Sequence, residues 1–153
     1  MESRVEKAQR LFKEGYNCSQ AIVGAFCDVY DMDLELALRV SAAFGAGMGR
    51  MREVCGAVSG MAIIAGLENG TVDGTDVEGK KSNYDLIVKL ASAFKEKNGS
   101  IICRELLGLE KKLDDKIDTR PAERNEQYYK SRPCLEKVKD CAEIIEEIIM
   151  KSK

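Results

Sequence analysis

The feature that most constrains the fold is the segment over residues 56–67, which is apolar on every side of a predicted helix. Polar turn residues bound it, and Cys55 comes directly before it. A helix that is hydrophobic all round is buried either in a membrane or at the centre of a domain. A membrane span needs about 20 apolar residues, so this segment is too short. We therefore predict a central buried helix over residues 56–67, with Cys55 at its N-terminal end.

The rest of the chain repeats apolar residues three and four positions apart, which is typical of amphipathic helices. Stripes of this kind fall on residues 5–12, 22–29, 34–44, 80–97, 101–107 and 135–149. Residues 110–132 are highly charged and predict short helix and loop, in which Arg120, Arg124, Tyr128 and Tyr129 either line a cleft or face solvent. No alternating strand pattern fits as well. The predicted fold class is therefore all-α, a compact multi-helix bundle around the central helix, with residues 1–153 forming one domain.

Composition excludes several function classes. A net charge of −2 gives no basic excess to neutralise phosphates, which argues against a nucleic-acid partner. Residues 1–14 are charged and helical in pattern, with no apolar signal region, so we expect a cytoplasmic location and no membrane insertion. The partner is then an unknown redox protein or small molecule, and the sequence leaves a homo-oligomer open.

The chain has six cysteines and no histidine. In a small secreted domain, six cysteines predict a disulfide framework; in a larger, cytoplasmic chain they favour thiol chemistry or metal binding. The absence of histidine removes the usual general base and excludes a Cys-His dyad of the protease type.

Position on the predicted helices divides the cysteines into two groups. Four lie at helix starts, where unpaired N–H groups and the positive end of the helix dipole favour a thiolate and lower its pKa. These are Cys18 after the cap Asn17, Cys55, Cys103 after the cap Ser100, and Cys134 after Pro133. The other two, Cys27 and Cys141, lie inside helices and are expected to be small packing residues.

Cys18, the run Cys55-Gly56-Ala57-Val58-Ser59-Gly60, Cys103 and Cys134 together resemble the C_GCAxxG_C_C family of redox-active proteins. Members of that family are about this long, carry a CGAxxG motif and have four characteristic cysteines. The resemblance covers nearly the whole chain from Asn17 to the last helix, and includes the glycine-rich residues 44–49. It implies redox chemistry at the four cysteines and places Cys27 and Cys141 outside the site.

Three functions stay open, and the first is thiol–disulfide chemistry. Cys55 is the best candidate for the reactive thiol, because Arg50 and Arg52 lie just upstream to stabilise a thiolate. Gly56 lets another backbone or a ligand approach closely. Cys18, Cys103 and Cys134 are the candidate partners, and the sequence does not choose a pairing. A thiol-dependent oxidoreductase is one form of this hypothesis, and the sequence leaves open whether the protein is an enzyme.

The second function is a metal site, in which the same four cysteines bind zinc or an iron–sulfur cluster. Their spacings of 37, 48 and 31 residues match no CxxC zinc or ferredoxin pattern. The third is a non-catalytic helical protein that binds a ligand or partner, with Gly56 and Gly60 permitting close helix contact. Gly56, Gly60 and Arg50 are the candidate cofactor-binding residues. The cofactor itself is not identified, and the protein need not have one.

Overall fold

The computed structural model describes residues 1–109 and 117–153, and over these ranges the fold is all-α, as predicted. The longer helices are α1 (Arg4–Lys13), α2 (Cys18–Phe26), α3 (Leu34–Ser41), α5 (Gly56–Asn69), α6 (Val77–Asn98) and α9 (Cys134–Ile148). Short helices are η1 (Cys27–Tyr30), η2 (Ala42–Phe44), α4 (Gly45–Met48), α7 (Cys103–Leu106), α8 (Glu126–Ser131) and η3 (Met150–Ser152). None of the described helices combines the length and apolar character needed to span a bilayer.

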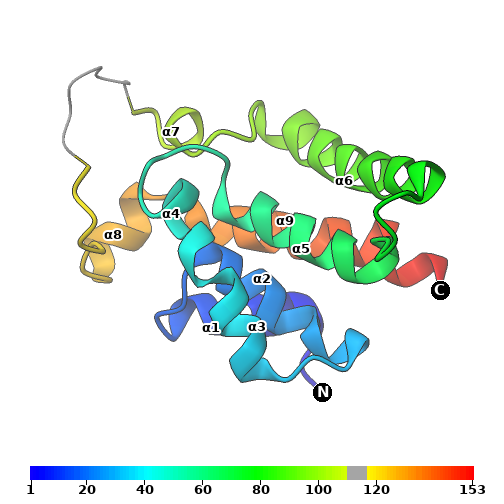
Figure 1. Cartoon of the computed structure of the whole chain (residues 1–153). Coiled ribbons are helices and arrows are strands. Elements are labelled where there is room, and N and C mark those ends of the chain that lie inside the picture. Colours follow the sequence, from blue (N-terminus) through cyan, green and yellow to red (C-terminus); the bar gives the residue numbers. More distant parts are fainter. Residues whose placement is uncertain (110–116) are drawn as a thin grey trace.

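The predicted central helix is confirmed as α5, which lies in the middle of the molecule with α6 on one side and α1 to α3 on the other (Figure 1). Helices α2, α6 and α9 pack directly against it. Its small residue Ala57 and its larger residues Met61 and Ile64 are fully buried. The core around them is built from Phe12, Ile22, Phe26, Leu90, Phe94, Val138 and Ile145.

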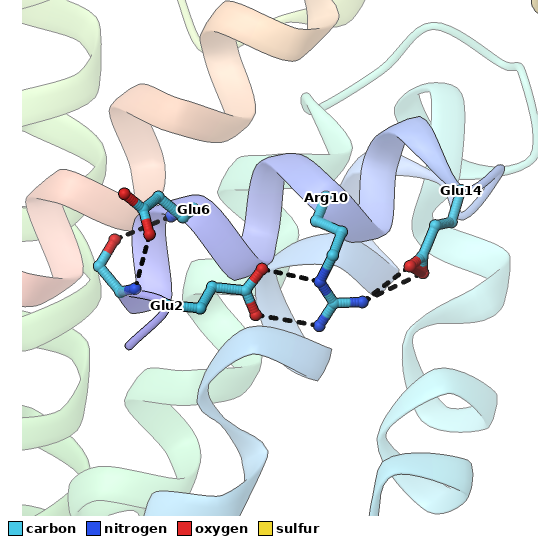
Figure 2. Close-up of polar contacts among 5 residues, drawn as sticks. Glu2, Glu6, Arg10 and Glu14 are labelled. Carbon is cyan, nitrogen blue, oxygen red and sulfur yellow. Dashed lines mark hydrogen bonds and ion pairs between the residues drawn. The ribbon is translucent and has the colours of Figure 1, made fainter.

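Side-chain caps set several helix starts. The Ser3 hydroxyl accepts from Glu6 N, and Arg10 pairs with Glu2 and Glu14 along the exposed side of α1 (Figure 2). Exposed ion pairs of this kind contribute little to stability. The start of α2 is held more firmly, by a capping box in which Asn17 and Gln20 bond each other's backbone N–H at 2.9 and 3.0 Å. This box fixes the first residue of α2, Cys18.

Some predicted boundaries are wrong, each for a local reason. Helix α6 begins at Val77 rather than Lys80, because the Asp76 carboxylate accepts from Gly79 N at 2.8 Å and caps the helix earlier. Helix α2 ends at Phe26, where the chain tightens into η1. In the charged segment 110–132, residues 110–116 lie outside the described part, and the remainder is loop followed by α8.

Candidate functional site

The four cysteines of the family pattern line one pocket of about 340 Å³. The prediction that they stand at helix starts is confirmed: Cys18, Cys103 and Cys134 are the first residues of their helices, and Cys55 is the N-cap of α5. The pocket lies at the end of the molecule where α5 and α9 begin and where α4, α7 and α8 gather (Figure 1). Four segments far apart in sequence thus bring their thiols to one place.

A single antiparallel bridge between Val54 and Ile102 brings Cys55 and Cys103 together. Cys55 N donates to the Ile101 carbonyl at 2.7 Å, and Cys103 N donates to the Glu53 carbonyl at 2.6 Å. Alternate residues of paired extended segments share a face, so the side chains of residues 55 and 103 leave the same side as diagonal neighbours. This pairing has no signal in the helical periodicity, and sequence reasoning missed it.

Gly56 provides the clearance that brings Cys18 into the site. A Cβ added at Gly56 would lie 2.4 Å from Cys18 Sγ and 2.9 Å from the Phe44 carbonyl oxygen. Gly56 also lines the pocket. Gly60 has a different role, since its added Cβ would lie 2.8 Å from Ile22 Cβ at the contact of α5 with α2. Of the two glycines predicted to bind a cofactor, only Gly56 therefore borders the pocket.

The loop before α5 has an unusual backbone. Residues 46–50 all have positive φ, between 55° and 71°, and Arg52 has φ 61°. For a residue other than glycine, this region costs about 1–2 kcal/mol. The turn is held by hydrogen bonds from Gly49 N to the Ala43 carbonyl and from Glu53 N to the Gly47 carbonyl, each 2.9 Å long.

This left-handed turn is packed tightly against the pocket. A Cβ at Gly47 would lie 2.7 Å from Cys103 Cβ, and the Ala46 backbone N–H hydrogen-bonds Cys18. The glycine-rich segment therefore works as a tight connection that positions two of the cysteines. Backbone strain of this kind persists only where the surroundings impose it.

The predicted lowering of thiol pKa values at the helix starts is wrong for three of the cysteines. Burial raises the pKa of Cys18 from 9.0 to about 11 and also raises the pKa of Cys55 and Cys134. Backbone N–H groups of Ala57 and Val58 lower the pKa of Cys55, but desolvation is the larger effect. A helix start stabilises a thiolate only when the thiol keeps contact with water or a cation.

Cys103 has the cationic neighbour that was expected for Cys55. Arg52 Nη1 lies 3.8 Å from Cys103 Sγ, within reach of a hydrogen bond to sulfur. The negative charge of a Cys103 thiolate also acts on the other three, raising the pKa of Cys18, Cys55 and Cys134. Cys103 is therefore electrostatically coupled to all three of the others, and so is Cys18, whose charge also raises the pKa of Cys55.

Arg50, the third predicted cofactor-binding residue, also lines the pocket. Its guanidinium donates to the Arg120 carbonyl and lies 3.9 Å from the Asp118 carboxylate.

Arg124 and Tyr128 also line the pocket, so of the two predicted alternatives these residues line a cleft. The Tyr128 hydroxyl hydrogen-bonds Cys134. Sequence reasoning missed two further lining residues, Arg132 and Lys137, which flank Cys134 along the chain.

Cys27 and Cys141 are buried and do not line the pocket, as the packing interpretation predicts. Burial raises the pKa of Cys141, and the charges of nearby Cys55 and Cys18 raise it further. Cys27 is 3% exposed, and its Sγ lies 3.4 Å from the Gly24 carbonyl oxygen. Cys141 is fully buried in α9.

All six cysteines are free thiols. Within residues 1–109 and 117–153, no group of three or more cysteine, aspartate or glutamate side chains is arranged to hold a metal ion.

The comparison with protein families agrees with this site. A family model described as "Putative redox-active protein (C_GCAxxG_C_C)" matches residues 16–148, which include all four pocket cysteines. The comparison with curated proteins finds no match, and neither does the comparison with solved structures. Because the family model spans most of the sequence, the chain belongs to the C_GCAxxG_C_C family.

Proposed function

We propose that this protein exchanges thiols and disulfides at the pocket, using Cys18, Cys55, Cys103 and Cys134. The observation that carries the proposal is that four thiols from four separate helix starts line one pocket. Thiol–disulfide exchange needs an attacking thiolate and a second thiol within reach. A packing role alone does not require four cysteines on one pocket wall.

Cys103 is the proposed attacking thiol, in place of Cys55. Its sulfur has a guanidinium neighbour in Arg52 at 3.8 Å, whereas burial holds the Cys55 thiol in its protonated form. A thiolate at Cys103 raises the pKa of the other three thiols. A negative charge at Cys103 would therefore add to burial in opposing ionisation of the neighbouring thiols.

The second thiol is proposed to come from Cys55 or Cys134. Cys55 is the diagonal neighbour of Cys103 across the Val54–Ile102 bridge. Cys134 is the least buried of the four, and its hydrogen bond with Tyr128 lowers its pKa against the effect of burial. In this proposal, the single domain and the reducing, cytoplasmic location predicted from the sequence are kept, since free thiols persist in such a compartment.

The experiment is a reversible oxidation of the purified chain, followed by counting free thiols. We expect the wild type to lose two or four of its six thiols and to regain them with a reductant. The Cys103→Ser variant is expected to be oxidised more slowly, and the Cys27→Ala variant, altered outside the pocket, should behave as the wild type does. Six thiols that stay free and alkylate slowly would overturn the proposal. Stoichiometric zinc or iron in anaerobically purified protein would replace it with the metal-site alternative.

A further inference from the structure

The pocket is strongly basic in an otherwise acidic chain. Five cationic side chains line it: Arg50, Arg52, Arg124, Arg132 and Lys137. Among the described residues, no aspartate or glutamate lines it. The whole chain carries a net charge of −2. A cavity wall of one charge sign, in a chain of the opposite sign, concentrates ions of complementary charge.

Two of the five cations hold the pocket together. Arg124 donates to the Phe12 carbonyl at 2.7 Å and to the Tyr16 carbonyl at 3.0 Å, with its guanidinium 4.1 Å from the Phe12 ring centroid. Lys137 Nζ donates to Asn98 Oδ1 at 2.6 Å. These contacts tie the loop before α8, and the start of α9, to the rest of the bundle.

The other three cations are not neutralised by close carboxylates. In the part of the chain that the structure describes, neither Arg52 nor Arg132 forms an ion pair, and Arg50 reaches only the exposed Asp118, at 3.9 Å. Arg132 instead stacks over Tyr128, with its guanidinium 5.6 Å from the ring centroid. Burial is the largest effect that lowers the pKa of Arg50, and repulsion from Arg52 and Arg132 lowers it further, against the attraction of Asp118. An anion in the pocket would relieve this repulsion.

Most of the remaining wall of the pocket is apolar, with Asn17 and Thr119 as polar exceptions. Phe12, Leu106, Leu107, Pro121, Ala122 and Pro133 contribute to it. The cavity of about 340 Å³ falls in the range of pockets that bind small organic molecules. Guanidinium groups bind carboxylates with two parallel hydrogen bonds. The fitting occupant is therefore a small organic molecule with carboxylate groups and a short apolar stem.

We propose that the pocket selects low-molecular-weight disulfides that carry carboxylates, an inference that rests on the proposed thiol–disulfide function. The Cys103 thiolate attacks one sulfur of the small disulfide, breaks its S–S bond and releases one anionic thiolate. A second pocket thiol then gives its proton to solvent and attacks Cys103 Sγ, which releases the second thiolate. Two protein thiols are oxidised to one disulfide, and the small disulfide is reduced to two thiols.

The test compares three small disulfides of similar length and different charge. They are 3,3′-dithiodipropionate, which is anionic, bis(2-hydroxyethyl) disulfide, which is neutral, and cystamine, which is cationic. The rate at which each oxidises the reduced protein is divided by its rate with a free small-molecule thiol, which removes intrinsic differences in reactivity. We expect the anionic disulfide to react about tenfold faster than the neutral one on this scale, with cystamine slowest, and the preference to shrink with added salt.

Variants connect the preference to the pocket. Arg132→Gln is expected to reduce the preference for the anionic disulfide, and Arg132→Lys to retain much of it, which separates charge from stacking on Tyr128. Arg39→Gln removes an exposed cation on α3 outside the cysteine pocket and should change nothing. Oxidation by all three disulfides without charge preference, or fastest by cystamine, would overturn the inference and leave the proposed function intact. Oxidation by none of them would contradict the proposed function itself.

Discussion

Replacing Gly56 by alanine tests how the site is assembled. The new Cβ would lie 2.4 Å from Cys18 Sγ and 2.9 Å from the Phe44 carbonyl oxygen, closer than side-chain carbons approach these atoms. Cys18 is 9% exposed at the buried start of α2 and has little room to move. Overpacking of this kind costs about 1–3 kcal/mol, which exceeds the gain of up to about 1 kcal/mol that alanine brings over glycine in a helix.

The same helix offers a matched control. Gly66 also lies in α5, but it is exposed and a Cβ added there meets nothing within 4 Å. We therefore expect Gly66→Ala to stabilise the protein by about 0.5–1 kcal/mol through helix propensity alone. Gly60→Ala, whose Cβ would meet Ile22 Cβ at 2.8 Å, should be destabilising like Gly56→Ala.

Urea denaturation followed by circular dichroism measures the free energy of unfolding of the three variants. The expected order of stability is Gly66→Ala, then wild type, then the two variants at the buried glycines. Only Gly56→Ala is expected also to change the alkylation rate of Cys18, because only that Cβ touches its sulfur. If Gly56→Ala is as stable as Gly66→Ala, the close contact between α5 and Cys18 is refuted.

Three further predictions follow from the charges and burial of the cysteines. Burial raises the pKa of Cys18 from 9.0 to about 11, so the folded state favours the protonated thiol. The contribution of the protonated Cys18 to the free energy of unfolding is therefore fully present below pH 9 and is lost as the pH rises from 9 to 11. A pH series of denaturation curves should show this loss, and Cys18→Ala should make it smaller. Arg52→Gln is expected to slow alkylation of Cys103 about tenfold, because a hydrogen bond to a charged group is worth about 1.5–3 kcal/mol; Arg39→Gln is the control, and equal rates would contradict the role of Arg52. Cys141→Ser places a hydroxyl at a fully buried position and should destabilise the fold by about 1–3 kcal/mol, as measured by urea denaturation, without changing the number of thiols lost on oxidation.

Local rules predicted several of the helix starts, because these depend on residues close in sequence. The predicted cap Ser100 is wrong, since the N-cap of α7 is Ile102 and the Ser100 hydroxyl accepts from Ile102 N at 2.9 Å instead. The cap Asn17 was correctly predicted from the residue type and the apolar stripe that follows. Pro133 likewise marked the start of α9. The central helix followed from its uninterrupted apolar surface. These signals were enough to place the four family cysteines at helix starts.

The electrostatics of the thiols could not be predicted in the same way. Burial of Cys55 depends on α2 and α7, which are distant in sequence, so the desolvation that raises its pKa has no local signal. The bridge between Val54 and Ile102 joins two single residues and produces no alternating pattern. It brings Cys103 beside Arg52, although the two lie 51 positions apart in sequence.

The left-handed turn over residues 46–50 was also beyond local rules. Glycines at 47 and 49 are compatible with it, but Ala46, Met48 and Arg50 disfavour positive φ. The tertiary contacts of the loop with Cys18 and Cys103 impose this backbone against the preference of those residues.

The most direct test of the account is to identify, by mass spectrometry of proteolytic fragments, which cysteines become linked when the reduced protein is mildly oxidised. The account predicts intramolecular disulfides among Cys18, Cys55, Cys103 and Cys134, with Cys103 present in the first pair to form. Cys27 and Cys141 should remain alkylated as free thiols. Linked pairs that contain Cys27 or Cys141, or a first pair that lacks Cys103, would contradict it.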